Sequence, residues 1–328
     1  QLADGFEQYL SIVFEDLVIM KSDGLPTYHL AHVVDDHEMR ITHVIRGEEW
    51  ISTAPLHVLI HGALGYGLPI YVHLPVILGK DKTKLSKRHG AAAALDYRDL
   101  GYLPDAVFNF LALLGWSPGG ASEVMPRQEI VRRFSLDRVN VSPAVFDSEK
   151  LDWMNGVYLR QMSLDALMDA LLPVLERATA APWPSVPRPL DRERVGALLP
   201  MVQDRLKKLT DGPDLLGVFF EDKVSPAREA LVQKGMDAAS TAAALREAHA
   251  LVASTQPFEP EALERAFRAL AERLELKPGQ FFGAIRVAIT ARTVAPPLFH
   301  TMAGIGRQKV VRRLEDAALL VEAAGTQA

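Results

Sequence analysis

The chain has 328 residues, of which 48% are hydrophobic and 23% charged, and its formal net charge is -5 at neutral pH. This balance excludes a disordered chain and is typical of a folded protein of two or three domains. No apolar run has the length of a membrane span, and the absence of cysteine excludes disulfides, thiolate zinc sites and cysteine nucleophiles. We therefore expect a cytoplasmic protein with no membrane segment. The negative charge argues against indiscriminate nucleic-acid binding, but not against a polynucleotide held by local basic patches.

The first quarter of the sequence alternates strand-like and helical segments. Strand-like apolar runs are predicted at residues 14–20, 41–45, 70–72 and 74–79. A turn is predicted at 21–24, and residues 52–64 have helical spacing, with Ser52 as the N-cap and Pro55 in the first turn. This order predicts a parallel sheet with crossover helices, and it predicts that 74–79 is a buried strand ending in a loop.

Helical periodicity dominates the rest of the chain. Helices are predicted at residues 102–115, 127–134, 164–177, 191–209, 226–234, 241–251, 259–274 and 307–323. Four prolines between residues 182 and 189 cannot continue a helix and indicate a linker. The sequence thus predicts an α/β part followed by a longer all-helical part.

The loop after the strand at 74–79 is strongly basic. Five cations fall within the nine residues 80–88. A loop at the carboxyl end of a strand is where an α/β sheet meets a polyanion such as a phosphate chain. The alternative is a solvated, charged loop with no ligand.

Two further segments have residues suited to a polar pocket. Tyr28 precedes an apolar helical stretch that ends in Asp35 and Asp36. These residues could line a pocket, or they could be a core tyrosine and two helix-capping carboxylates. We do not expect the two aspartates to form a catalytic dyad, because adjacent helical residues point about 100° apart.

The segment from Arg46 to Trp50 has the residue types of an anion site. An arginine at the end of a strand, before Gly47, can present its planar fork to a carboxylate, and Trp50 can wall off the pocket. The alternative is a surface salt bridge.

Seven histidines lie in the first part of the chain and could be mistaken for metal ligands. They are His29, His32, His37, His43, His57, His61 and His73. The pair His57 and His61 lacks the intervening glutamate of a zinc protease. We therefore interpret these side chains as surface or core histidines and expect no metal site.

Taken together, several segments resemble one family. Lys84-Leu85-Ser86-Lys87-Arg88 resembles the Lys-Met-Ser-Lys-Ser loop of class I aminoacyl-tRNA synthetases, in the variant typical of glutamyl-tRNA synthetases. The resemblance to the bacterial-type glutamyl enzymes extends over essentially the whole chain, through residues 16–24, 26–28, 33–36, 45–50, 101–104, 113–117, 146–147, 150–156 and 285–290.

The resemblance implies a two-step ligase. Glutamate and ATP would form glutamyl-adenylate, and the glutamyl group would then be transferred to the terminal ribose of tRNA-Glu. It places L-glutamate against Tyr28, His32, Arg46 and Trp50. It places ATP, which acts with Mg²⁺, against Glu49, Val76, Ile77, Lys84, Leu85, Ser86, Lys87 and Arg88. The lysines would stabilise charge on the phosphates as pyrophosphate leaves.

The resemblance also implies a domain organisation. Residues 1–89 would be the C-terminal half of a class I Rossmann catalytic domain, 90–158 a mostly α-helical stem-contact region, and 159–225 and 226–328 two all-α anticodon-binding subdomains. Arg205 and Arg286 would contact the anticodon. We expect a monomer that holds no zinc.

The sequence departs from the family in one important respect. The His-Ile-Gly-His element that binds ATP opposite the basic loop occurs nowhere in the 328 residues. We therefore expect the chain to be a fragment that is inactive alone. The alternative is a non-catalytic tRNA-binding protein built from a synthetase body. Two other readings fit less well: the short relative that glutamylates queuosine in tRNA-Asp lacks the long helical part, and glutaminyl-tRNA synthetase has a β-barrel-rich C-terminal region.

Overall fold

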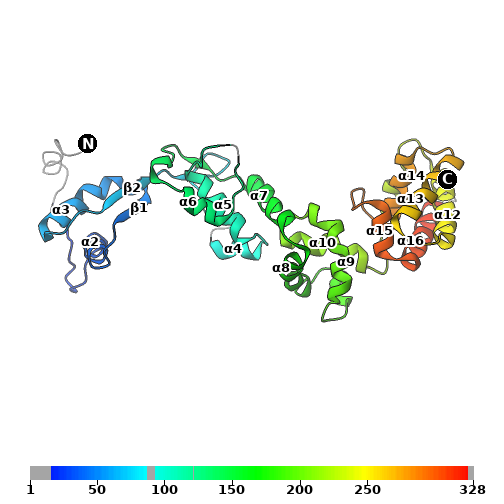
Figure 1. Cartoon of the computed structure of the whole chain (residues 1–328), viewed down its shortest axis with the longest axis horizontal. Helices are drawn as coiled ribbons and strands as arrows, with labels where there is room; N and C mark the ends of the chain where they lie inside the picture. Colours follow the sequence, from blue (N-terminus) through cyan, green and yellow to red (C-terminus); the bar gives the residue numbers. More distant parts are fainter. Residues whose placement is uncertain (1–15, 87–92, 121, 324–328) are drawn as a thin grey trace. The chain divides into compact units, whose positions relative to one another are not determined.

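The structure is a computed structural model that describes residues 16–86, 93–120 and 122–323 (Figure 1). The chain forms two compact units. Unit 1 contains the residues up to Ala93 together with residues 108–148, and unit 2 contains residues 94–107 together with those from Glu149 onward. None of the helices in the described ranges is both long and apolar enough to cross a bilayer.

A parallel strand pair with a crossover helix organises the first part of unit 1. Strands β1 (His43–Gly47) and β2 (Ile70–Leu74) pair in parallel, with His43 opposite Ile70 and Gly47 opposite Leu74. Between them run the 3-10 helix η1 (Glu48–Thr53) and helix α3 (Ala54–Leu64), which ends at Gly65 with a φ of 69°. Helix α2 (Tyr28–Glu38) packs on α3 through a small apolar cluster of Val33, Leu56 and Ile60. The parallel pair predicted from the strand–helix–strand order is confirmed.

Local details before this pair differ from the prediction. The predicted strand at 14–20 lies partly outside the described residues, and within 16–20 only Met20 forms a bridge, to Pro26. The turn at 21–24 is confirmed, with Gly24 at a φ of 82°. The predicted N-cap is wrong: Ser52 lies inside η1, because a 3-10 turn precedes α3, although Pro55 is in the first helical turn as expected.

The predicted buried strand at 74–79 is shorter and less buried than expected. Strand β3 (Ile77–Leu78) has two residues, is only half-buried, and pairs in parallel with β4 (Ala144–Val145). Its other edge pairs with the returning basic segment: the amide of Leu85 donates to the carbonyl of Ile77 at 2.8 Å. The predicted strand at 74–79 is divided between two sheets. Leu74 is the last residue of β2, which pairs with β1, whereas Ile77 and Leu78 form β3, which pairs with β4.

The remainder of unit 1 is a small helical layer. Helix α5 (Pro104–Gly115) begins in unit 2 and ends in unit 1, and it is followed by α6 (Arg127–Arg133) and the 3-10 helix η3 (Leu136–Arg138). Trp116, Met125 and Ile130 form the buried cluster between them. The helices predicted at 102–115 and 127–134 are confirmed, with the first starting two residues later.

All regular secondary structure in the described residues of unit 2 is helical. Its helices are α4 (Ala94–Asp99), α7 (Ser148–Gln161), α8 (Leu164–Glu176), η4 (Trp183–Ser185), α9 (Arg192–Val202), η5 (Gln203–Arg205), η6 (Leu209–Asp211), α10 (Gly212–Phe220), α11 (Arg228–Leu231), α12 (Ala238–Ser254), α13 (Pro260–Arg273), α14 (Pro278–Thr290), α15 (Leu298–Ile305) and α16 (Arg307–Glu322). One large apolar cluster runs through them, and α12 and α16 lie side by side (Figure 1). Side chains of Ser163, Asp191 and Asp237 cap α8, α9 and α12, because their oxygens accept the free first-turn N–H groups.

Two predictions for unit 2 are incorrect. The helix predicted at 191–209 ends at Val202, and the predicted helices did not include α4, α7, α10, α14 or α15. Long-range hydrogen bonds redirect the chain after Val202: Gln203 donates to the carbonyls of Leu159 and Met162, and the amide of Leu209 donates to the carbonyl of Gly101. The apolar spacing continues past residue 202 because Leu206 and Leu209 are still buried, although they lie outside any α-helix.

Candidate functional site

Arg46 is the centre of the candidate site in unit 1. It lies next to the end of β1, where the chain turns into η1. Its Nε donates to Nε2 of His73 at 3.1 Å, its Nη1 lies 3.1 Å from Nδ1 of His57, and its Nη2 donates to the carbonyl of Trp50 at 3.4 Å. A guanidinium has five N–H donors, so one donor remains on each terminal nitrogen.

The two histidines reach Arg46 from different elements. His73 is the residue opposite Arg46 in the β1–β2 register, so the two side chains lie on the same face of the strand pair. His57 comes from the first turns of α3 and is completely buried. Burial, followed by the nearby charges of His32 and Arg46, lowers the pKa of His57 to about 3. Burial and then the charge of Arg46 also lower the pKa of His73. Both imidazoles are therefore neutral at neutral pH.

Aromatic rings surround the guanidinium. Its carbon lies 4.9 Å from the ring centre of Tyr71 and 5.9 Å from that of Trp50. Trp50 in turn contacts Tyr28, the first residue of α2, with 4.9 Å between ring centres. Aromatic faces carry negative potential and stabilise a cation without neutralising its charge. The structure thus brings together Tyr28, Arg46 and Trp50, which the family resemblance had placed in one site.

His32 lies beside this group on α2. Its ring stacks on that of Tyr28, with 5.5 Å between centres and an interplanar angle of 11°. Its Nδ1 lies 3.1 Å from the carboxylate of Asp36, and its Nε2 is buried without a hydrogen-bond partner among the described residues. Burial lowers the pKa of His32, partly opposed by Asp36. Asp36 therefore contacts His32, a contact that its neighbour Asp35 does not make.

The charge on Arg46 is not compensated within the described ranges. No carboxylate of residues 16–86, 93–120 or 122–323 lies within 4 Å of its guanidinium. Its acceptors are two neutral rings and a backbone carbonyl. A half-buried cation with neutral partners and two unused donors has the geometry to accept an anion such as a carboxylate.

The basic segment forms a hairpin on β3. Lys84 bridges to Leu78, and the turn is held by Asp81, which accepts hydrogen bonds from the amide and hydroxyl of Thr83. The ammonium of Lys84 lies 3.1 Å from a carboxylate oxygen of Glu49, and both side chains are largely exposed. The pKa of Glu49 is lowered, first by its own backbone N–H and then by Lys84.

Other predicted residues of the phosphate-binding segment have clear positions. Leu85 and Val76 are half-buried, Ile77 is in β3, and Ser86 is exposed. The amide of Val76 donates to Glu48 at 3.4 Å. Lys87 and Arg88 lie outside the described residues. The two glutamates after Gly47 thus contact the two parts of the predicted ATP segment. Glu48 contacts Val76, and Glu49 contacts Lys84.

The predicted anticodon residues lie in unit 2. Arg205, in η5, is exposed and lines a cleft of about 650 Å³ together with Asp214 and the loop that follows α14. Arg286 lies on α14, one turn before Thr290, and is half-buried. Neither Arg205 nor Arg286 forms a side-chain hydrogen bond or ion pair with another described residue. Arg292, at the cleft, forms a two-point ion pair with Asp214 at 2.7 and 3.1 Å.

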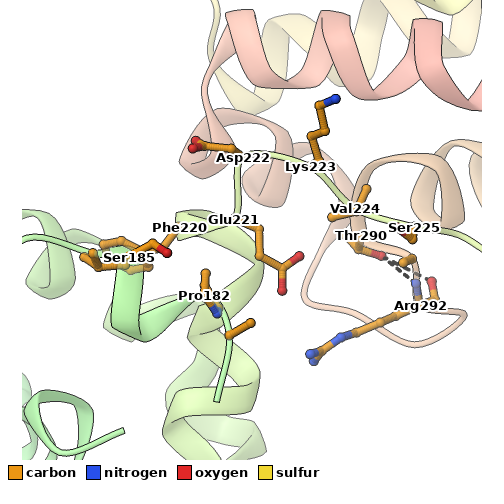
Figure 2. A pocket seen from close by; sticks show the side chains of 13 residues that line it. Pro182, Ser185, Phe220, Glu221, Asp222, Lys223, Val224, Ser225, Thr290 and Arg292 are labelled. Carbon is orange, nitrogen blue, oxygen red and sulfur yellow. Dashed lines mark hydrogen bonds between the residues drawn. The ribbon is translucent and has the colours of Figure 1, made fainter. Parts of the chain in front are cut away.

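A second cleft of unit 2, of about 560 Å³, shares part of this loop. Figure 2 shows its lining by the segment after α10, including Glu221 and Asp222, and by Thr290 and Arg292. The hydroxyl of Thr290 accepts from the amide of Arg292 at 3.2 Å, which fixes the loop at the end of α14. The loop after α14 therefore forms a wall of both clefts.

Sequence reasoning missed several contacting residues. His57 and His73 were interpreted as ordinary core or surface histidines, and Tyr71, Asp214 and Arg292 were not selected. For His73, the sequence predicted two parallel strands nearby, but the register that places His73 opposite Arg46 comes from the structure. For the helical region, nothing in the local sequence pairs Asp214 with Arg292, which lie 78 residues apart. Among the described residues, no group of three or more His, Asp or Glu side chains could hold a metal ion.

Comparisons with known proteins give consistent matches. A family model described as tRNA synthetases class I (E and Q), catalytic domain, matches residues 7–153, and one described as anticodon binding domain matches residues 166–318. The chain is 50% identical over 303 residues to the glutamate–tRNA ligase of Roseiflexus sp. strain RS-1, covering 92% of this chain and 60% of that protein. It is 46% identical over 314 residues to the glutamate–tRNA ligase of Chloroflexus aurantiacus, covering 94% and 62%.

Solved structures agree with these matches. The structure of a glutamate tRNA ligase from Elizabethkingia meningosepticum, in complex with its amino acid, has a TM-score of 0.79 and 30% identity, and the match covers 94% of this chain and 63% of that one. The glutamate–tRNA synthetase of Elizabethkingia anophelis has a TM-score of 0.78 and 31% identity, with the same coverage. The chain thus spans about 60% of the length of these curated relatives.

Proposed function

Because the chain belongs to the class I glutamate and glutamine tRNA synthetases, we propose that it acts in the ATP-dependent joining of L-glutamate to tRNA-Glu. The carboxylate of glutamate would attack the α-phosphate of ATP, forming glutamyl-adenylate as pyrophosphate leaves. A hydroxyl of the terminal tRNA ribose would then attack the acyl carbon and release AMP. We place this activity in the cytoplasm, in a monomer.

The observation that carries this proposal is the uncompensated charge of Arg46. Its two unused N–H donors, one on each terminal nitrogen, match the two oxygens of the side-chain carboxylate of glutamate. Glutamine offers a neutral amide in place of a carboxylate, so it would leave a donor facing an NH₂ group and the charge unmatched. Arg46 thereby favours glutamate, with Tyr28, His32 and Trp50 as the walls of the same pocket.

The hairpin and the glutamates after Gly47 supply the ATP side of the proposed site. Val76 and Ile77 would present backbone groups to adenine, and Glu49 would accept hydrogen bonds from the ribose. The exposed Lys84 would turn from Glu49 towards the phosphates when Mg²⁺-bound ATP enters. Lys84 would stabilise the transition state electrostatically, because negative charge builds on the phosphate oxygens as pyrophosphate departs. Leu85, Ser86, Lys87 and Arg88 would complete this loop.

The helical regions would bind tRNA. We propose that residues 1–89 correspond to the second half of a Rossmann catalytic domain, 90–158 to a stem-contact region, and 159–225 and 226–328 to two anticodon-binding subdomains. The side chains of Arg205 and Arg286 form no hydrogen bond or ion pair with another described residue, which supports an external partner. The cleft beside Arg205 offers a position for an unstacked base.

Ligand-observed NMR tests the amino-acid site directly on the 328-residue chain. L-Glutamate is expected to bind and L-glutamine to bind at least about tenfold more weakly, because an ion-paired contact is lost. Arg46→Met should abolish the difference. Arg132→Met is the matched control, because that exposed arginine of α6 lies in the same unit and, among the residues that the structure describes, forms an ion pair only with Glu129. Equal binding of both amino acids, or an unchanged preference in Arg46→Met, would contradict the proposal.

A further inference from the structure

We propose that His57 and His73 are positioning residues for Arg46: two neutral imidazoles with opposite tautomers that hold the guanidinium without neutralising it. This inference rests on the proposed function of Arg46 as the carboxylate receptor. It assigns the histidines a role in substrate selection that their residue types alone do not indicate.

The tautomers follow from the hydrogen bonds. A guanidinium can only donate, so both ring nitrogens facing Arg46 must carry a lone pair. The nitrogen facing Arg46 is Nδ1 in His57 and Nε2 in His73, each at 3.1 Å. A neutral ring carries one proton, and therefore the proton lies on Nε2 in His57 and on Nδ1 in His73.

A third histidine continues the hydrogen-bond series that runs from Arg46 to His57. Nε2 of His57 lies 3.0 Å from Nδ1 of His29, at the start of α2. Since His57 has its proton on Nε2, it donates to His29, whose Nδ1 accepts. A directed series of hydrogen bonds thus runs from Arg46 through His57 to His29 and links β1, α3 and α2.

The surroundings keep these rings neutral. The cluster of charged or titratable side chains around His57 and His73 draws on every neighbouring element: Tyr28, His29, His32 and, beyond His32, Asp36 on α2, Arg46 on β1, His61 on α3, and Tyr71 on β2. Asp36 is the single carboxylate in this set of described residues, and it is engaged by His32. Burial and the positive neighbours both disfavour protonation, and they lower the pKa of both rings from the ordinary 6.5.

Neutrality has a functional consequence. A carboxylate at either position would hold Arg46 more firmly but would neutralise the charge that the substrate must pair with. An imidazole fixes the orientation and leaves the charge available. Because the pKa of each ring is lowered from the ordinary 6.5, both rings are neutral at pH 7 and above, and their titration is not expected to alter glutamate binding between pH 7 and 8.

Paired variants separate positioning from simple structural support. In His57→Asn and His57→Asp, one side-chain oxygen takes the place of Nδ1, and the two variants have the same shape. For His73, whose contact is made by Nε2, the corresponding pair is His73→Gln and His73→Glu. L-Glutamate should bind the two amide variants within about threefold of the unchanged chain, and the two carboxylate variants at least about tenfold more weakly. Equal binding by the amide and carboxylate members of a pair would overturn the inference.

Nitrogen-15 NMR of histidine-labelled chain provides a readout that does not depend on glutamate. His57 should show an unprotonated Nδ1 and a protonated Nε2 from pH 5 to 8, and His73 the reverse at pH 7 to 8. A protonated Nδ1 in His57, or a midpoint near 6.5 for either ring, would also overturn it. If Arg46→Met retains its preference for glutamate over glutamine, the proposed function itself fails, whatever the tautomers are.

Discussion

Replacing Arg313 with methionine should destabilise unit 2 substantially. Arg313 lies on α16 and is 2% exposed. Its Nη1 donates to the carbonyl of Ile289 at 2.6 Å, and its Nη2 donates to those of Val218 and Glu221 at 3.0 and 2.6 Å. These carbonyls belong to the C-terminal ends of α14 and α10, where the backbone has no partner within its own helix. One buried side chain therefore satisfies the ends of two helices.

The magnitude follows from the groups left without a partner. Glu221 keeps a second donor, because Lys309 also donates to its carbonyl at 3.0 Å, so Arg313→Met orphans two carbonyls rather than three. A buried unsatisfied carbonyl costs about 1 to 3 kcal/mol. Burial lowers the pKa of Arg313, which means that its charge is costly to bury, and this cost disappears in the variant. We expect a net loss of about 3 kcal/mol in the free energy of unfolding.

Urea unfolding followed by circular dichroism measures this loss. Arg312→Met is the matched control, because Arg312 is the exposed neighbour on the same helix, and it should change the free energy of unfolding by less than about 0.5 kcal/mol. The reasoning would be refuted if Arg313→Met were as stable as this control. That outcome would mean that water replaces the guanidinium at the two helix ends.

Two glycines provide further predictions. Gly101 has a φ of 87°, and an added Cβ would lie 2.7 Å from the backbone nitrogen of Thr210. Gly101→Ala should therefore destabilise unit 2 by about 2 kcal/mol or more and accelerate amide exchange at Thr210. Unchanged exchange at Thr210 would contradict this prediction. At Gly47 the added Cβ would meet the flexible carboxylate of Glu49. Gly47→Ala should therefore displace that carboxylate from Lys84 and weaken ATP binding. The free energy of unfolding should change by less than about 1 kcal/mol, because the Lys84–Glu49 ion pair is exposed. Unaltered ATP affinity in a titration would contradict the proposed role of Glu49.

The parts of the fold that could be predicted are those specified by local chemistry. The helices with side-chain caps were predicted within a few residues of their observed start, as for α8 after Ser163 and α9 after Asp191. The end of α9 could not be predicted, because it depends on hydrogen bonds to residues more than 40 positions away. The apolar spacing gave the opposite indication, since Leu206 is buried outside the helix.

The same distinction applies to the site. The segment that contains Arg46 and Trp50 is contiguous, so its chemistry was visible in the sequence. The partners that orient Arg46 come from α3 and β2, 11 and 27 residues further along the chain, and histidine is common enough in both buried and exposed positions to carry little signal alone. Only the strand register and the packing of α3 reveal that these rings face the guanidinium.

The acceptors around each arginine distinguish binding residues from structural ones. Arg292 is paired with the carboxylate of Asp214, so an anionic ligand would have to compete with an existing partner. Arg313 is buried and donates to three carbonyls, so it stabilises helix ends and has no access to a ligand. Arg46 has only neutral acceptors and two donors to spare, and Arg205 has no side-chain partner among the described residues. Because the guanidinium of Arg46 has no carboxylate partner among the described residues and is half-buried, we propose it as a position where an external anion can bind without displacing an existing partner, and we propose the same for the exposed Arg205 of unit 2.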